Sequence, residues 1–316
     1  MKTVVSTKRV LLTGSNGFLG RVVLQHLLQA GYSITLGGRC APLGWSGDFV
    51  QFDLTNPELL RKAFSRSQEF DIVIHAAGTL QKDCLSVNHV GTRNLLSEIG
   101  HRAAKWIQIS SAGVYRNDYR SVVTESTLCE QITEYEKSKW LADQEVINGC
   151  NSYVILRPTM IAGLGMKGSP LRLFAKFVSY GFRPEFREDA CLNMIHVNDV
   201  AAAVLHFCHP SLHDGLHGEL ILSDDIFLNE VIEIIERSLS ISQPCRRIPD
   251  CILKNLAGLG SAIGIQSFNK RRYAILNNTA RFHADRFRSL LAGWPLCGSR
   301  SAIHQVCASP TNIHQQ

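Results

Sequence analysis

Short apolar runs alternate with amphipathic stretches along the first half of the chain. The apolar runs that predict strands are residues 10–12, 34–36, 49–52, 71–75, 106–109 and 153–156. The stretches that predict helices between them are residues 19–29, 57–64, 87–99 and 134–147. Strands and helices that alternate in this way form a parallel sheet covered on both faces. We therefore expect an α/β fold with a Rossmann-type, doubly wound parallel sheet.

The pattern changes after Pro158. A glycine-rich loop at 163–168 is followed by helical patterns at 171–180 and 197–207, a short strand at 219–222, and a mostly helical remainder. We expect the apolar segment 252–265 to be a buried helix rather than a lid or a membrane-facing helix, and the polar tail 309–316 to fray. The predicted domains are a Rossmann domain (1–163 and 192–223) and a smaller, mostly helical C-terminal part (164–191 and 224–316).

Composition excludes several classes of protein. The 316 residues carry a net charge of +6, and the densest basic cluster, 270–272, is only three residues long, so no nucleic-acid partner is expected. The ten cysteines lack metal-type spacing, which indicates reduced thiols and no metal site. No apolar run reaches about 18 residues, so no membrane span is predicted. The N-terminal segment lacks the apolar core of a secretory signal, and we expect a cytoplasmic protein.

A glycine-rich turn joins the first predicted strand to the first predicted helix. It reads Thr-Gly-Ser-Asn-Gly-Phe-Leu-Gly over residues 13–20. Such a turn brings the backbone and the free N–H groups of a helix N-terminus to a pyrophosphate, although glycines also serve tight turns without a ligand. The turn predicts a dinucleotide site, and its candidate contacts are Gly14, Asn16, Gly17, Phe18, Leu19 and Gly20.

The end of the second predicted strand bears on which dinucleotide binds. A site for NAD has an acid near this point for the ribose 2′-OH, whereas the 2′-phosphate of NADP needs a cation. The sequence has no acid here, and Arg39 can make two parallel bonds to a phosphate. We expect NADP(H) to be favoured over NAD(H), the alternative being that Arg39 is a surface arginine without this contact. Further candidates are Asp53 and Leu54 at the adenine edge and Ala76, Ala77 and Gly78 beside the ribose.

Three residues form a candidate catalytic set. Tyr135 and Lys139 lie four apart in a predicted helix and therefore share a face. Ser111 follows the fifth strand at the carboxyl edge of the sheet, where ligands bind. Hydride transfer to a ketone needs a proton and hydrogen bonds at the developing alkoxide. Tyr135 is the predicted acid–base, and we expect the Lys139 cation to lower its pKa.

These motifs, in this order, resemble the extended short-chain dehydrogenase/reductases, above all their NAD-dependent epimerase/dehydratase branch. The resemblance rests on residues 13–20, Asp53, 75–78, Asn88, Ser111, Tyr135, Lys139, 156–158, 196–201 and 292–295. It implies that Ser111 holds the substrate oxygen, Ser110 being the alternative, and that Lys139 also holds the nicotinamide ribose. It further implies that Asn88 fixes the backbone near the lysine, a surface amide being the alternative, and that the helices carrying Asn88 and Tyr135 form a homodimer interface.

The resemblance also implies a substrate class. Members of this branch commonly act on nucleoside-diphosphate sugars, and residues 165–173 are similar to the equivalent stretch of bacterial 4-keto-6-deoxy-sugar reductases and related epimerases. Lys167 and Arg172 in the C-terminal part are the candidate cationic contacts. Departures from the family pattern at Arg116 and at 161–164 bear on the shape of the substrate pocket.

We therefore predict an NAD(P)-dependent oxidoreductase that reduces a 4-keto nucleoside-diphosphate sugar. One alternative is a nucleotide-sugar epimerase that retains its NAD(P). A second is a reductase of steroid- or flavonoid-like ketones, which would favour an apolar pocket. A third, from a different class, is a non-catalytic NADP(H)-sensing binding protein, and the joint presence of Ser111, Tyr135 and Lys139 argues against it.

Overall fold

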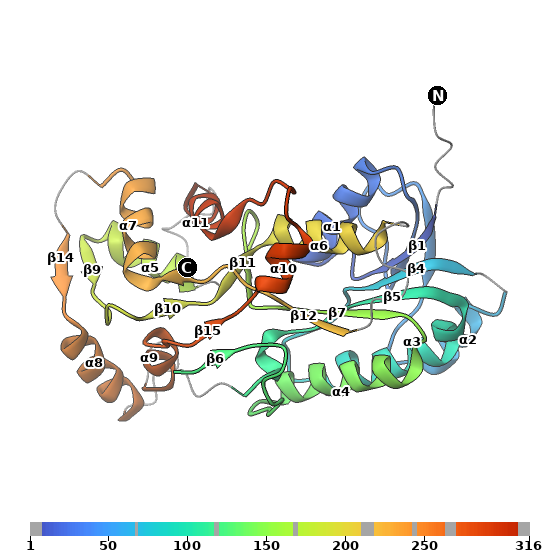
Figure 1. The fold of residues 1–316 in the computed structure, drawn as a ribbon, viewed down its shortest axis with the longest axis horizontal. Coiled ribbons are helices and arrows are strands. Elements are labelled where there is room, and N and C mark those ends of the chain that lie inside the picture. Colours follow the sequence, from blue (N-terminus) through green and yellow to red (C-terminus); the bar gives the residue numbers. More distant parts are fainter. Residues whose placement is uncertain are drawn as a thin grey trace.

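The computed structural model describes residues 8–66, 69–116, 120–166, 170–209, 218–241, 245–262 and 270–308. Its main sheet has seven strands in the order β12-β7-β5-β4-β1-β2-β3, and every neighbouring pair is parallel (Figure 1). The strands are β1 (Arg9–Thr13), β2 (Ser33–Gly38), β3 (Asp48–Gln51), β4 (Phe70–His75), β5 (Ala103–Ile109), β7 (Tyr153–Pro158) and β12 (Gly218–Leu222). The strand order reverses between β1 and β4, which creates a ligand crevice at their carboxyl ends. The predicted Rossmann-type fold is confirmed.

Helices cover both faces of this sheet (Figure 1). One face carries α1 (Phe18–Gln29) and α6 (Val197–Cys208), and the other carries α2 (Pro57–Ala63), α3 (Gly91–Ile99) and α4 (Glu134–Gly149). Apolar side chains that alternate along β1 pack on both sides, with Val10 and Leu12 in one cluster and Leu11 in the other. A π-helical turn, Leu85–Val90, precedes α3. The sequence pattern predicted one helix over 87–99 and did not separate this turn from it.

The C-terminal region is mostly helical, as predicted, and most of it lies at one end of the molecule (Figure 1). Its helices are α5 (Pro170–Ser179), α7 (Leu228–Ser238), α8 (Asp250–Ala262), α9 (Lys270–Leu276), α10 (Asp285–Leu290) and α11 (Gly298–Ala308). Short strand pairs join them: β8 (Met160–Ala162) with β11 (Met194–His196), β9 (Phe182–Pro184) with β14 (Arg246–Ile248), β10 (Cys191–Leu192) with β13 (Ile226–Phe227), and β6 (Val122–Val123) with β15 (Arg281–Phe282). Its own apolar core includes Leu171, Phe174, Val231 and Ile303, whereas Phe287 packs into the core of the main sheet.

Helix α8 corrects the expectation of a buried helix over 252–265. Among the residues of α8 whose burial is described, Leu253 and Ala257 are the buried ones, while Ile252, Leu256 and Leu259 are 47%, 48% and 59% exposed. The prediction is wrong because α8 is at the periphery, where it packs mainly against α9 along one narrow face. Residues 263–265 and the tail 309–316 lie outside the described residues. Within the described ranges, no helix combines the length and the apolar character that crossing a bilayer requires.

Candidate active site

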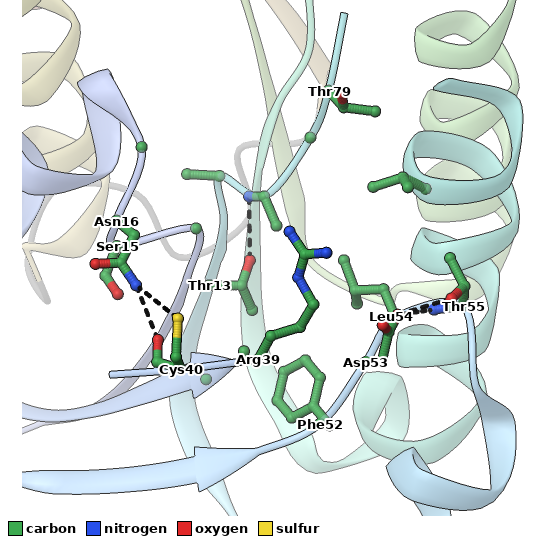
Figure 2. A pocket seen from close by; sticks show the side chains of 18 of the residues that line it. Thr13, Ser15, Asn16, Arg39, Cys40, Phe52, Asp53, Leu54, Thr55 and Thr79 are labelled. Atoms are coloured by element: carbon green, nitrogen blue, oxygen red, sulfur yellow. Dashed lines mark hydrogen bonds between the residues drawn. The ribbon is translucent and has the colours of Figure 1, made fainter. Parts of the chain in front are cut away.

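A cavity of about 540 Å³ opens at the carboxyl ends of β1, β2 and β4 (Figure 2). Four chain segments line most of it: the glycine-rich turn, the end of β2, the segment after β3 and the segment after β4. The sequence-predicted residues among its lining are Gly14, Asn16, Gly17, Arg39, Asp53, Leu54, Ala76, Ala77 and Gly78. The parallel strand order brings these distant segments together at one edge of the sheet.

The glycine-rich turn fits a pyrophosphate. Gly14 has a φ of +76°, and a Cβ added there would lie 2.6 Å from the backbone carbon of Ala76, so only glycine is accommodated. Helix α1 begins at Phe18 without a side-chain cap and without an acid in its first turn, which leaves its N–H groups and positive end available to an anion. Leu19 and Gly20 are buried in α1 and do not line this cavity among the described residues.

Figure 2 shows the charged side chains Arg39 and Asp53 in the lining of this cavity. The Arg39 guanidinium extends from the end of β2 into the cavity. Asp53 accepts hydrogen bonds from the backbone N–H and the hydroxyl of Thr55, at 2.8 and 2.7 Å. These bonds, and to a smaller extent the Arg39 charge, lower the pKa of Asp53, so it is a carboxylate at neutral pH. Asn16 donates to the carbonyl of Cys40 at 2.8 Å and ties the glycine-rich turn to β2.

A second cavity, of about 870 Å³, contains the candidate catalytic residues Ser111 and Tyr135. Asn16 lines both cavities, so the two adjoin. The apolar part of the lining comprises Phe18, Val22, Leu80, Ala112, Pro158, Met160, Ile161, Leu164, Met166 and Phe282. Among the described lining residues, Arg21 is the single cation, and its Nε donates to the carbonyl of Asn16 at 3.0 Å. The sequence analysis missed Arg21, which follows the last glycine of the turn.

The two adjacent serines have different surroundings. Ser111 is half-buried, accepts a hydrogen bond from the N–H of Gly113 at 3.1 Å, and shares the second cavity with Tyr135, whose pKa it lowers. Ser110 also lines the second cavity, but the residue is only 3% exposed and its hydroxyl donates to Asp143 at 2.8 Å. Successive side chains at the end of a strand point to opposite faces, so only one of the two can meet Tyr135. That one is Ser111.

Lys139 and Asn88 are buried beside the first cavity. The Lys139 Nζ donates to the carbonyl of Ile109 at 2.8 Å. A Cβ added to Gly78 would lie 3.1 Å from this Nζ and 3.1 Å from Oδ1 of Asn88, so both side chains border the cavity wall. The Asn88 amide accepts from the N–H of Thr79 at 2.8 Å and donates to its carbonyl at 2.9 Å and to Ser138 at 2.9 Å. Asn88 thus fixes the backbone after β4 against α4.

The electrostatics of Tyr135 differ from the expectation. Burial raises the pKa of Tyr135, and the neighbouring Ser111 hydroxyl lowers it by less. Burial lowers the pKa of Lys139 to about 8, which leaves the side chain cationic at neutral pH. The expected lowering of the Tyr135 pKa by Lys139 is not found, because burial dominates and the Lys139 Nζ is turned to the Ile109 carbonyl.

The two predicted substrate cations are not among the described residues that line the second cavity. Arg172 is half-buried on α5, and its contact with a substrate stays a prediction. Lys167 lies outside the described residues.

One group of metal-ligand types occurs among the described residues: His196, Asp199 and Cys297. Both carboxylate oxygens of Asp199 accept backbone N–H bonds, from Cys297 at 2.7 Å and from Gly298 at 2.9 Å. These bonds hold the N-terminus of α11, which accounts for the buried acid without a metal ion.

The strand order, the glycine-rich turn and the Tyr135–Lys139 pair define a dinucleotide-binding α/β protein of the short-chain dehydrogenase/reductase type. The sequence profile of the NAD dependent epimerase/dehydratase family matches residues 10–212. The chain belongs to this family, whose members are NAD(P)-dependent enzymes.

Two curated relatives match a little over half of the chain. It is 27% identical over 208 residues to ceramide reductase of Caulobacter vibrioides, covering 63% of this chain and 60% of that protein. It is 30% identical over 177 residues to dTDP-6-deoxy-L-talose 4-dehydrogenase (NAD(P)(+)) of Kitasatospora kifunensis, covering 52% of this chain and 55% of that protein. The chain therefore spans less than two thirds of the length of either relative.

Solved structures match nearly the whole chain. The Bordetella bronchiseptica enzyme WbmG, in complex with NAD and UDP, has a TM-score of 0.71 and 18% identity, covering 95% of this chain and 94% of that one. RMD of Pseudomonas aeruginosa, complexed with NADPH, has a TM-score of 0.67 and 19% identity, covering 95% and 98%. At these identities the likeness shows the fold alone.

Proposed function

We propose that this protein reduces a keto group of a nucleoside-diphosphate sugar, at position 4 of the sugar, with NADPH. The observation that carries the proposal is the junction of two cavities at Asn16, with the dinucleotide cradle on one side and Ser111 and Tyr135 on the other. A dTDP-sugar 4-dehydrogenase among the relatives and UDP in the WbmG complex support the substrate class.

The chemistry follows from the residues that line the second cavity. The bound dinucleotide supplies the hydride that the carbonyl carbon receives. Tyr135 donates the proton that the carbonyl oxygen takes up as the C=O bond becomes a C–OH bond. Ser111 donates a hydrogen bond to the same oxygen while negative charge develops on it. Lys139, whose Nζ borders the dinucleotide cavity, would hold the nicotinamide ribose, and Asn88 keeps the wall beside it in place.

The preference for NADPH is inferred from Arg39. The loop at the end of β2 contributes Arg39 and no acid to the cavity lining, which favours a 2′-phosphate over a 2′-hydroxyl. NAD in the WbmG complex and NADPH in the RMD complex indicate that proteins of this fold use either dinucleotide.

Substrate binding is assigned to residues 164–191 and 224–316 together with Arg21. The Arg21 guanidinium and the predicted contacts Lys167 and Arg172 would meet the diphosphate. We also propose a homodimer through the helices that carry Asn88 and Tyr135.

A second candidate function is the reduction of an apolar ketone. The predominantly apolar side chains of the second cavity favour it, and so does the name of the ceramide reductase relative. Such a substrate would carry no anionic group to pair with the Arg21 guanidinium.

Oxidation of NADPH, followed with three substrate sets, tests these functions. The proposal predicts turnover with UDP- or dTDP-linked 4-keto-6-deoxy sugars, one NADPH being consumed for each product molecule. Turnover of a sphingoid or β-keto lipid alone would favour the second candidate. Interconversion of sugar epimers without net NADPH consumption would identify an epimerase. No turnover in any set, together with no thermal shift by a nucleotide sugar, would refute the proposal.

A further inference from the structure

Asp143 lies on the same face of α4 as the candidate catalytic residues. Tyr135, Lys139 and Asp143 follow one another at intervals of four residues, which is the spacing of neighbours along a helix face. The carboxylate is 0% exposed. The mechanism described above does not use it.

The partners of Asp143 come from the two strands that position the site. Its Oδ2 accepts from the Ser110 hydroxyl at 2.8 Å, from Nε of Arg157 at 3.1 Å, and faces the second guanidinium nitrogen at 3.0 Å. Ser110 directly precedes Ser111 at the end of β5, and Arg157 directly precedes Pro158 of the second cavity. One carboxylate oxygen therefore joins α4 to the ends of β5 and β7.

The other carboxylate oxygen, Oδ1, is buried and has no hydrogen-bond partner among the described residues. A buried ion pair with an unsatisfied oxygen is not an efficient way to stabilise a fold, because apolar side chains of similar volume often do as well or better. Stability alone therefore does not explain why a charge lies behind the catalytic helix.

The charge of Asp143 acts on Lys139. Burial lowers the pKa of Lys139 to about 8, and the Asp143 carboxylate opposes that effect. Burial raises the pKa of Asp143 to about 6, while Arg157, Ser110 and Lys139 favour its ionised form. The other titratable groups around the Tyr135–Lys139 pair are His75 on β4, Cys84 before the π-helical turn, Glu136 on α4 and Arg157 on β7. His75 is neutral, since burial lowers its pKa to about 3.

We propose that Asp143 is a positioning residue of the active site, which holds a negative charge behind Lys139 and fixes the Ser110 end of β5. Lys139 then stays cationic where it borders the dinucleotide cavity, and Ser111 stays directed toward Tyr135. This role rests on the proposed function, because it takes Ser111, Tyr135 and Lys139 to be the catalytic residues of that function.

The test removes the charge and keeps the hydrogen bond. Asp143→Asn retains an acceptor for Ser110, and Arg157→Met in the same protein removes the cation that would otherwise be left buried and unpaired. The matched control is Arg183→Met with Glu236→Gln, which removes an ion pair of 2.6 Å between β9 and α7. Asp143→Glu is the conservative variant, because it keeps the charge.

Two readouts separate this role from the proposed function. The first is the titration of Lys139, followed by NMR of ¹³C-lysine-labelled protein and assigned through Lys139→Met; it needs no substrate. We expect the Lys139 pKa to fall by about half a unit or more in the Asp143→Asn, Arg157→Met protein, and to stay at the wild-type value in the control and in Asp143→Glu. An unchanged pKa in the double variant would overturn the proposal whatever the substrate is.

The second readout is the pH dependence of kcat with an accepted substrate. Because Lys139 would lose its proton at a lower pH, the alkaline limb of the profile should move to lower pH, and kcat at pH 8 should fall about twofold or more. An alkaline limb that does not move would contradict the role in the reaction. If no nucleotide sugar is turned over, the proposed function fails, while a shifted Lys139 titration still supports the electrostatic role. If the double variant does not fold, the comparison is made between Asp143→Glu and Asp143→Asn, with the same expected difference in titration.

Discussion

His75 Nδ1 lies 2.8 Å from Oγ1 of Thr13, so the last residue of β4 is linked to the last residue of β1 at the start of the dinucleotide cavity. On the other side of the ring, Nε2 lies 3.1 Å from the hydroxyl of Thr92 on α3. The ring is 0% exposed, and burial, with a smaller effect from Lys139, lowers its pKa to about 3. A neutral histidine therefore holds β1 and β4 together at the point where the strand order of the sheet reverses.

This buried histidine predicts a loss of stability in acid. The unfolded chain binds a proton at His75 near pH 6.5, whereas the folded chain does so only near pH 3. The contribution of neutral His75 to the free energy of unfolding is therefore present above about pH 6.5 and is lost as the pH falls toward 3. Between pH 7 and pH 5 the loss should be about 2 kcal/mol. Urea unfolding at both values checks this, and His75→Gln should remove about that much of the pH dependence; an equal dependence in the variant would contradict it.

Replacing the phenol of Tyr135 should abolish most of the turnover. Tyr135→Phe removes the proton donor and no packing volume of note, so kcat should fall by about 10²–10⁴-fold while the dinucleotide still binds. The measurement is steady-state NADPH oxidation together with a binding titration. Tyr180→Phe, at a side chain that is 57% exposed, is the matched control and should behave as wild type. Turnover retained in Tyr135→Phe would remove this residue from the mechanism.

The two serines should separate activity from stability. Ser111→Ala removes a hydrogen bond to the substrate oxygen, and we expect kcat to fall by about 10²-fold with little change in melting temperature. Ser110→Ala removes a donor from the buried Asp143 carboxylate, and we expect a cost of about 1–3 kcal/mol in unfolding free energy with a smaller effect on kcat. Steady-state kinetics and urea unfolding measure both effects. If Ser110→Ala lost activity and Ser111→Ala lost stability, Ser110 would be the serine that binds the substrate oxygen.

Arg39 should determine the choice of dinucleotide. Arg39→Ala removes a charged hydrogen-bond donor from the 2′-phosphate, so the Kd for NADPH should rise by about 10–100-fold and the Kd for NADH should stay within about twofold. Fluorescence titration of both dinucleotides measures the ratio. Arg93→Ala, at an exposed position on α3, is the control. An unchanged NADPH-to-NADH ratio would show that Arg39 does not set the preference.

Most of the main sheet could be predicted because its strands are short apolar runs bounded by turn residues. The end of β1 and the start of α1 were also predictable, since glycines with a required conformation mark the turn. The π-helical turn at Leu85–Val90 was not, because six residues are too few to distinguish its period from that of an α-helix. The exposure of α8 was not predictable either, since periodicity identifies an apolar face and not the neighbour that covers it.

The candidate site was predictable as a set of residues and not as a set of contacts. The spacing of Tyr135 and Lys139 indicated a shared helix face, but whether the lysine faces the phenol depends on where β5 ends. In the structure its Nζ meets the Ile109 carbonyl. Asp143 gave no signal in the sequence, because its importance arises only when β5 and β7 bring Ser110 and Arg157 to it.

The central claim is that a substrate carbonyl lies between Tyr135 and the reactive ring of a bound nicotinamide. Incubation with each epimer of NADPH deuterated at C4 of the nicotinamide, in the presence of an accepted 4-keto sugar nucleotide, tests it most directly. One epimer should deliver its deuterium to the former carbonyl carbon of the product, with one label transferred for each NADPH oxidised. A product without deuterium from either epimer would contradict the account.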